Sequence, residues 1–480
     1  MLSNILRYHP LLLVFLLILC GCKVAQVNLP QAQPIPQTFT GSADTVSIGT
    51  LPLKEFFNDP HLISLIDTAL QKNFDLRVAV QRIEMARANL RLGKGALLPS
   101  VNAVASAGAD KYGEYTLNGV GNYDTNLSEN IGPDRRIPTD PTPDYFLGLR
   151  SSWEVDIWGK LRNGKKAAFA RLLASEKGQQ LITTSLVAEV ASLYYELLAL
   201  DYQLDIVRKN IIFQQTVVEL ITIQKEGGRT TELAVQQSTA QLLNTRALEV
   251  KIQQEIIALE NTLNFLLGRF PQPIQRENTL LSQAIPSVVS AGVPSAMLRH
   301  RPDIQQAELE LEAAKADLQA ARAAFFPSLT ITSYAGFNAF KSGLLFDPGS
   351  LALGVLGGLS APIFSHNRIQ SQYKRSSAEN IAAVYAYQKA IVNGFREVAT
   401  GLKSIENLNL MYNLKNQEVT VLRNAVTTAN DLFVAGYASY LEVITAQRNV
   451  LEAELGLANT RKEQFLSIID LYRALGGGWQ

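Results

Sequence analysis

Apolar residues recur with the period of a helix over long stretches of this chain. One such stretch, residues 144–270, contains no proline, a residue that helix interiors exclude because it lacks an amide donor and its ring clashes with the preceding turn. Within it, apolar side chains alternate steps of four and three at Leu186, Val190, Leu193, Leu197, Leu200, Leu204, Val207 and Ile211. This spacing places one apolar stripe along a helix. We predict very long helices, packed either as a coiled coil or as an ordinary bundle.

The second half of the chain repeats this design. Residues 363–480 again lack proline, and Ile391, Phe395, Val398, Leu402 and Ile405 keep the four-three spacing. Short motifs align the halves: Asn73-Phe74-Asp75 with Arg301-Pro302-Asp303 and Leu98-Pro99-Ser100 with Phe326-Pro327-Ser328, 228 positions apart, then Gly228 with Gly436 and Leu267-Gly268 with Leu475-Gly476, 208 apart. Two constant offsets predict an internal duplication. The change of offset places a longer loop in the first copy, between the Pro-Ser pair and the glycine turn.

Between the helical stretches the period changes to alternation. A first helical segment, Leu62 to Leu97, ends at Pro99, and alternating apolar and polar residues then predict strands. The predicted strands are 101–108 and 147–155 in the first copy and 329–337 and 351–360 in the second, and residues 109–144 are predicted to be a long exposed loop. Each strand has about ten residues, the length that crosses a bilayer at a tilt.

Four strands are too few to close a membrane barrel. An open sheet in lipid would leave edge amides and carbonyls unpaired at several kcal/mol each, and a barrel needs about eight strands or more. If these strands lie in a membrane, the barrel must therefore be shared between subunits. The alternative is a four-stranded sheet in water.

The predicted helices are long enough to cross a wide space. Residues 160–226 would form a helix on the order of 100 Å long, and pieces at 74–98 and 230–268 would match it if stacked end to end. We expect a rod with strands at one end and a glycine turn at the other.

The N-terminus has the features of a targeting segment. Arg7 precedes the apolar run Leu11 to Leu19, which is too short to span a bilayer as a helix. The run ends in Leu19-Cys20-Gly21-Cys22, which resembles the lipobox of bacterial lipoproteins. That resemblance implies a signal peptide at 1–21 and acyl chains, palmitate among them, on Cys22. Lys23, in place of the Asp that commonly retains lipoproteins at the inner membrane, favours the outer membrane; the alternative is an ordinary secretory signal with incidental cysteines.

Composition narrows the function classes. The chain has two cysteines, and Cys20 would leave with the signal peptide, so the mature chain is expected to form no internal disulfide. The 44 basic and 43 acidic residues are balanced and indicate no nucleic-acid partner.

Several motifs in order resemble the TolC-like outer-membrane efflux proteins, in the lipoprotein (NodT-type) branch that serves resistance-nodulation-division pumps. The motifs are Arg299-His300-Arg301-Pro302-Asp303-Ile304, Phe326-Pro327-Ser328, Trp153-Glu154-Val155-Asp156 with Gly159, Ser360-Ala361-Pro362-Ile363-Phe364, Ala435-Gly436, and Leu475-Gly476-Gly477-Gly478-Trp479. The resemblance implies a mainly α fold with a transmembrane β-barrel. Four strands from each protomer of a homotrimer would close a twelve-stranded barrel, continued by a periplasmic α-barrel of long antiparallel coiled-coil helices.

The domain organisation that follows has five parts. They are the signal peptide 1–21, a lipid-anchored extended tether at 22–60, a first structural repeat at 61–270 with its turn at 227–228, a linker at 271–298, and a second repeat at 299–480 with its turn at 436.

The resemblance implies a passive channel of a tripartite efflux system, anchored to and spanning the cell outer membrane with a large periplasmic part. Its partners would be outer membrane lipid, a periplasmic adaptor (membrane fusion) protein and an inner-membrane resistance-nodulation-division transporter. The cargo would be small molecules such as drugs or other toxic compounds, of identity not readable from a wide polar tunnel. Two alternatives stay open, a type I secretion exit duct and a non-conducting structural envelope lipoprotein.

A gate is expected at the periplasmic tip. In related channels a leucine, an aspartate four residues on and an arginine three further narrow the closed tip, and these positions fall on Leu441, Thr445 and Arg448. Thr445 departs from that pattern, so Glu442 is the candidate for the charge. The alternative places Leu441 in the helix seam and leaves Glu442 facing solvent.

The tip turns are the predicted adaptor contact because they are the only tight helical hairpins far from the strands. The residues are Gly227, Gly228, Arg229, Thr230, Thr231, Glu232, Gly436 and Tyr437.

Enzyme sites are not expected. Residues 159–166 have phosphate-loop spacing, yet Lys166 stands where Ser or Thr should bind magnesium, and we interpret them as the start of the long helix. His9, His61, His300 and His366 have no metal-ligand partner at helical spacing. We expect no catalytic residue, no metal and no cofactor other than lipid at Cys22.

Overall fold

The computed structural model describes residues 47–276 and 294–479, together with 30, 34, 36, 38, 39, 280, 281 and 292. Cys22 and the predicted signal peptide lie outside the described residues, as do most of the predicted tether and much of the predicted linker.

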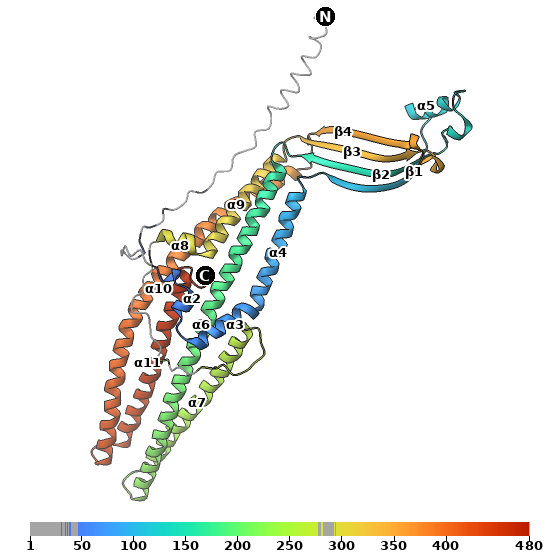
Figure 1. The fold of residues 1–480 in the computed structure, drawn as a ribbon. Coiled ribbons are helices and arrows are strands. Elements are labelled where there is room, and N and C mark those ends of the chain that lie inside the picture. Colours follow the sequence, from blue (N-terminus) through green and yellow to red (C-terminus); the bar gives the residue numbers. More distant parts are fainter. Residues whose placement is uncertain are drawn as a thin grey trace. The chain divides into compact units, whose positions relative to one another are not determined.

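Helices dominate the described chain, and one sheet interrupts them (Figure 1). Short helices η1 (Ile48–Thr50) and α2 (Leu53–Phe56) come first. The first half continues with α3 (Pro60–Lys72), α4 (Phe74–Gly95), β1 (Ser100–Asp110), α5 (Leu117–Asn126), η2 (Pro133–Arg135), β2 (Thr142–Val155), α6 (Lys160–Glu226) and α7 (Glu232–Leu266). The second half contains α8 (Pro294–His300), α9 (Pro302–Ala323), β3 (Ser328–Ala339), η3 (Ser342–Leu344), η4 (Pro348–Ser350), β4 (Leu351–Ser360), α10 (Arg368–Val434) and α11 (Tyr440–Ala474).

The internal duplication is confirmed by the helices. Helices α4 and α9 both have 22 residues and start 228 positions apart. The next pairs, α6 with α10 at 67 residues and α7 with α11 at 35, start 208 positions apart. The loop between β1 and β2 has 31 residues and that between β3 and β4 has 11, a difference equal to the change of offset. The extra residues of the first copy therefore lie in this one strand connection.

Two predicted segments differ from the structure. The single helical segment expected from Leu62 to Leu97 is two helices, because Asn73 adopts an extended ψ of 133° and its side chain accepts from the amides of Asp75 and Leu76 at the start of α4. The predicted loop 109–144 contains helix α5 and the first residues of β2. Thr116 caps α5 by accepting from the Gly119 amide, a local signal that apolar periodicity does not reveal.

The chain forms two compact units, and each combines segments of both halves. One unit contains 86–172 and 310–384, which include the strands, and the other contains 31–85, 173–309 and 385–480. In the first, β1, β2, β3 and β4 form an antiparallel sheet in sequence order.

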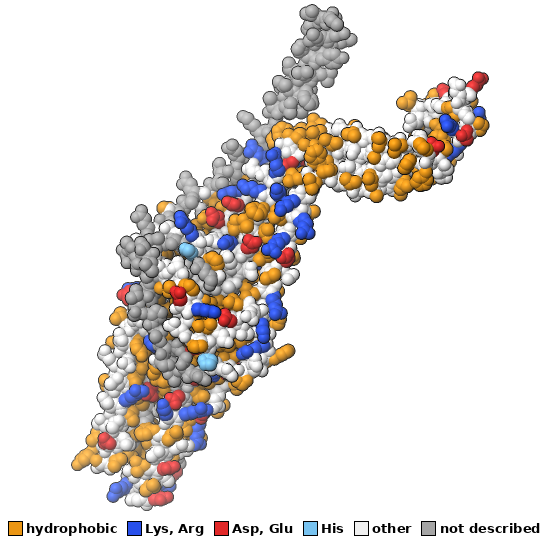
Figure 2. All heavy atoms as spheres, viewed as in Figure 1, with side chains coloured by type: hydrophobic (Ala, Val, Ile, Leu, Met, Phe, Trp, Pro, Cys, Tyr) orange, Lys and Arg blue, Asp and Glu red, His pale blue; other side chains and the backbone are white. Residues whose placement is uncertain are grey.

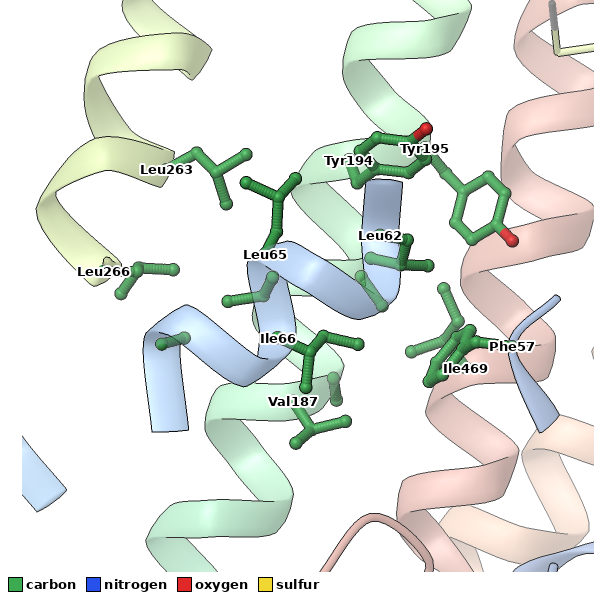
Figure 3. Close-up of a cluster of buried hydrophobic side chains, with 14 of the residues drawn as sticks. Phe57, Leu62, Leu65, Ile66, Val187, Tyr194, Tyr195, Leu263, Leu266 and Ile469 are labelled. Carbon is green, nitrogen blue, oxygen red and sulfur yellow. The ribbon is translucent and has the colours of Figure 1, made fainter. Parts of the chain in front are cut away.

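The core of the helical unit follows the predicted apolar stripe. Leu186, Val190, Leu197, Val207 and Ile211 on α6 are buried. Figure 3 shows α3 packed between α6, α7 and α11, with Ile66 and Tyr194 in the same cluster. The buried Tyr194 hydroxyl donates to Asp59 Oδ2 at 2.7 Å. A window of α6 is apolar enough to cross a membrane, but 56% of it is buried within the protein, which agrees with a core helix.

A matching joint closes each repeat inside this unit. Asn73 Nδ2 donates to the Leu266 carbonyl at the end of α7 at 2.9 Å, and Arg301 Nη1 donates to the Ala474 carbonyl at the end of α11 at 2.7 Å. The glycine after each long helix is close-packed: a Cβ on Gly268 or Gly476, both with positive φ, would collide with a backbone carbonyl. Equivalent residues thus connect the end of α7 to the start of α4 in the first copy and the end of α11 to the start of α9 in the second.

Arg301 is expected to be a large contributor to stability. Its buried guanidinium also pairs with Asp303 at 2.7 Å and Glu397 at 2.8 Å, so Arg301→Ala would remove the arginine donor from two carboxylates and from the Ala474 carbonyl. We expect the folded state to lose about 3–5 kcal/mol, measured by denaturant unfolding in detergent. Arg396→Ala removes an exposed arginine one helical position from Glu397 and should cost under about 1 kcal/mol. Equal losses in the two variants would contradict this role.

Candidate functional site

The strand register sorts the sheet residues into two chemically distinct faces. One face is almost wholly apolar along every strand. Its residues are Val101, Ala103, Ala105 and Ala107 on β1; Tyr145, Leu147, Leu149, Trp153 and Val155 on β2; Leu329, Ile331, Ala335 and Phe337 on β3; and Leu351, Leu353, Val355 and Leu359 on β4. In Figure 2 hydrophobic side chains gather along the strands, whereas charged side chains gather on the helices. Leu353 and Val355 remain 69% and 79% exposed, so no described part of the chain covers them.

The opposite face is polar and carries charges. Its polar members are Ser100, Asn102, Ser106, Arg150, Ser152, Glu154, Ser328, Thr330, Thr332, Tyr334, Asn338 and Ser360, and Val104, Phe146 and Leu356 are apolar exceptions on the same face. Alternation of this kind fits a sheet with lipid on one side and water on the other. The strands have 10 to 14 residues, enough to cross a bilayer when tilted.

The outer edges of the sheet stay open. Among the described strands, β1 pairs only with β2 and β4 pairs only with β3. In lipid the amides and carbonyls along those edges need another partner, because hydrocarbon supplies none. The sheet is therefore a fragment of a larger barrel.

Two tryptophans donate hydrogen bonds at the junctions between the strands and the helices. Trp153 Nε1 donates to the Leu97 carbonyl at 3.0 Å, and Trp158 Nε1 donates to the Pro327 carbonyl at 2.8 Å while its ring stacks on Phe326. Tryptophan is favoured at a membrane interface because its ring is apolar and its N–H is polar. Trp158 was not singled out from the sequence, because a lone aromatic residue after a strand gives no periodic signal.

Residues 159–166 begin helix α6, as interpreted from the sequence. Gly159 has φ of 78°, and the Asp156 carboxylate accepts from the amides of Leu161 at 3.0 Å and Arg162 at 2.8 Å. Burial disfavours its charge, but the hydrogen bonds outweigh burial and lower the Asp156 pKa. The first amides of α6 therefore already bind an anionic group, the Asp156 carboxylate.

The two glycine turns have the same backbone geometry. Gly228 and Gly436 adopt φ of 72° and 84°. The amide after each glycine donates back across the turn, Arg229 to the Gln224 carbonyl and Tyr437 to the Leu432 carbonyl, both at 2.8 Å. This Schellman-type hydrogen bond requires a left-handed residue at the glycine position.

Different side chains stabilise the two turns. Thr231 caps α7 by accepting from the Ala234 amide, and Lys225 pairs with Glu232 at 2.5 Å across the first turn. At the second turn Ser439 and Glu442 form a capping box, with the Ser439 hydroxyl 2.9 Å from Glu442 Oε2. Both turns belong to one surface, because buried residues from all four helix ends form a single cluster: Val217, Ile221, Ala234, Phe433 and Val443.

The predicted contact residues at these turns are accessible. Tyr437 is 85% exposed, and Gly227, Arg229 and Thr231 are exposed, while Thr230 is half-buried. A Cβ at Gly228 or Gly436 would meet no neighbouring atom within 4 Å. The turns thus present an open surface with one prominent aromatic side chain.

The predicted gate residues share one exposed helix face. Leu441 is 57% exposed, and Thr445 and Arg448 follow it at helical spacing and are also exposed. Within the single chain the buried position of this turn belongs to Val443, which is fully buried, rather than to Leu441. Glu442 is exposed, and hydrogen bonds from the Ser439 amide and hydroxyl lower its pKa, which keeps it ionised.

The positive φ of Gly436 is expected to make any other residue at this turn destabilising. Gly436→Ala should destabilise the local fold by about 1–2 kcal/mol because alanine resists positive φ. Gly456 lies inside α11, where an added methyl would meet no neighbour within 4 Å, so Gly456→Ala is the matched control and should stabilise by about 0.5–1 kcal/mol. Hydrogen exchange of the flanking amides measures both, and a shift of the same sign in the two variants would refute the assignment.

The chain resembles known proteins in both sequence and fold. The sequence model described as Outer membrane efflux protein matches residues 65–269 and 293–477. The toluene efflux pump outer membrane protein TtgI of Pseudomonas putida is 31% identical over 485 residues, covering 99% of each chain. The cation efflux system protein CusC of Escherichia coli is 31% identical over 472 residues, covering 97% of each. The solved structure of the outer-membrane channel OprN matches with a TM-score of 0.83 at 27% identity, over 95% of this chain and 100% of that one.

Proposed function

Because the chain belongs to the outer membrane efflux protein family, we propose that it is the passive exit duct of a tripartite efflux system. It is an outer membrane channel component with a large helical periplasmic part. The observation that carries the proposal is the sheet with one apolar face, one polar face and two unpaired edges.

The proposed assembly is a homotrimer. Three sheets of four strands would give twelve, which exceeds the minimum for a closed barrel and is an even number, as bacterial barrels require. Pairing β1 of one protomer with β4 of the next would satisfy both open edges. The polar face would then line the lumen and the apolar face would meet outer membrane lipid.

The proposed partners are a periplasmic adaptor protein and an inner-membrane resistance-nodulation-division transporter, which supplies the energy. The chain itself acts as a conduit rather than an enzyme. Acyl chains on Cys22, outside the described residues, would hold the N-terminus at the membrane. Relatives named for toluene and cation efflux support small solutes as cargo over secreted proteins, and the transporter would choose among them.

The proposed division of the chain keeps the boundaries predicted from its motifs. The signal peptide and tether precede two repeats, 61–270 and 299–480, joined by the linker 271–298. The matching helix lengths support these boundaries.

Leu441, Glu442, Thr445 and Arg448 are proposed to narrow the closed tip. Three copies would converge on the axis, where an apolar ring obstructs water and a charged ring selects ions. Thr445 offers no carboxylate, so Glu442 supplies the negative charge there.

Single-channel conductance in planar bilayers tests the duct and its gate together. The wild type should conduct weakly, and Leu441→Ser should raise its conductance several-fold because a hydroxyl removes the dewetting barrier. Leu233→Ser is the matched control, since Leu233 is the equivalent of Leu441 in the first repeat and is 54% exposed. Absence of current in folded trimers of every variant would favour a non-conducting structural lipoprotein instead.

The tip turns, including Glu232 beside Lys225, are proposed to dock the adaptor. Tyr437 should dominate that contact, because exposed tyrosines are enriched among interface residues whose truncation is costly. Tyr437→Ala should weaken adaptor binding by about tenfold or more while leaving channel conductance unchanged. Tyr115→Ala, at a 98% exposed tyrosine before α5, is the control. Full export and adaptor affinity in Tyr437→Ala would exclude this docking site.

A further inference from the structure

The polar face of the sheet has an ordered row of side chains across all four strands. Asn102 on β1 lies opposite Arg150 on β2, Arg150 lies opposite Tyr334 on β3, and Tyr334 lies opposite Gly354 on β4. The Tyr334 ring occupies the space above Gly354, where any Cβ would collide with it. Glycine at 354 therefore lets the tyrosine ring lie flat on the sheet.

Arg150 is held over an aromatic platform. Its guanidinium lies 4.7 Å from the centre of the Phe146 ring, and Phe146 meets the Tyr334 ring edge-on at 6.2 Å. Phe146 is only 5% exposed, although it stands on the polar face. The stacking leaves the five N–H donors of Arg150 available around the plane of the guanidinium.

The charge of Arg150 is uncompensated in the described part of the chain. The neighbouring acidic residue on this face, Glu154, pairs with Lys160 at 2.8 Å. Asp144, nearer the loop end of β2, accepts from Asn338 at 2.7 Å. No described carboxylate lies within ion-pair distance of Arg150, which is exposed.

A hollow of about 630 Å³ opens beside this arginine. Its lining on the polar face includes Asn102, Arg150, Ser152, Thr332 and Tyr334, with one apolar side chain, Leu356. The hollow thus combines a cation, hydroxyl and amide donors, and an aromatic face. These groups suit an anion attached to an aromatic ring, because guanidinium binds two oxygens of a carboxylate or sulfonate through paired hydrogen bonds and the rings can stack.

We propose that Arg150, with Asn102 and Tyr334, forms an anion-selective subsite inside the barrel that takes aromatic carboxylates and sulfonates. The proposal rests on the proposed function, since three copies must face one lumen. A ring of arginines favours anions in a pore. Its field reaches about 10 Å at 0.1 M salt, so selectivity should weaken as salt is raised.

Block by a fluorescent aromatic polyanion, pyrenetetrasulfonate, tests the subsite. The probe is added to the loop side of trimers in planar bilayers, and anion over cation permeability is measured in a potassium chloride gradient. We expect Arg150→Gln to weaken the block about tenfold and to lower anion permeability relative to cation permeability. Arg150→Lys should keep the permeability preference while losing much of the block, because lysine keeps the charge without the planar fork.

Arg136→Gln supplies the control, because it removes an exposed arginine from the β1–β2 loop and leaves the row intact. Block and permeability unchanged in Arg150→Gln, or no block of the wild type, would overturn the subsite while leaving the duct in place. If no variant conducts, the duct fails, and fluorescence anisotropy of the probe with detergent-solubilised trimers decides the subsite separately. Equal binding to wild type and Arg150→Gln would then refute it.

Discussion

Hydrogen bonding at the two open edges of the sheet is the constraint on which the rest of the structure depends. The apolar face excludes water from one side, and lipid offers no donors or acceptors to the edges of β1 and β4. Identical sheets arranged around an axis can pair every edge and close, whereas a single chain cannot.

The two repeats use the same packing arrangement of helices twice. Asn73 and Arg301 occupy equivalent positions. Each donates to the last carbonyl of a 35-residue helix, α7 or α11, although one is a neutral amide and the other a buried cation. The second joint is more elaborate because Arg301 also binds Asp303 and Glu397. The tip turns diverge in the same way: their backbones match, but an ion pair stabilises one and a capping box the other.

Periodicity and motif spacing predict most of this fold because long helices and alternating strands repeat a local rule. The offsets of 228 and 208 predict the paired helices to the residue. Local capping escapes that rule, so the break at Asn73 and helix α5 after Thr116 were missed. The sequence also did not show which apolar residue at the start of α11 is buried, because Leu441 and Val443 are both apolar. In the structure Val443 packs in one cluster with Phe433 and Ile221. Arg150 gave no signal, because its significance comes from its cross-strand neighbours Asn102 and Tyr334.

Disulfide cross-linking between strand edges tests the shared barrel most directly. The chain has only Cys20 and Cys22, so a cysteine at Val101, Ala103 or Ala105 on β1, combined with Val355→Cys on β4, reports on the open edges. A cysteine pair at Leu149 and Ala335, which face each other within one chain, is the control and should link no chains together. If three sheets share one barrel, at least one β1–β4 pair should yield a ladder ending at three chains on non-reducing gels. Monomers from every pair, or a ladder that continues beyond three, would contradict that arrangement.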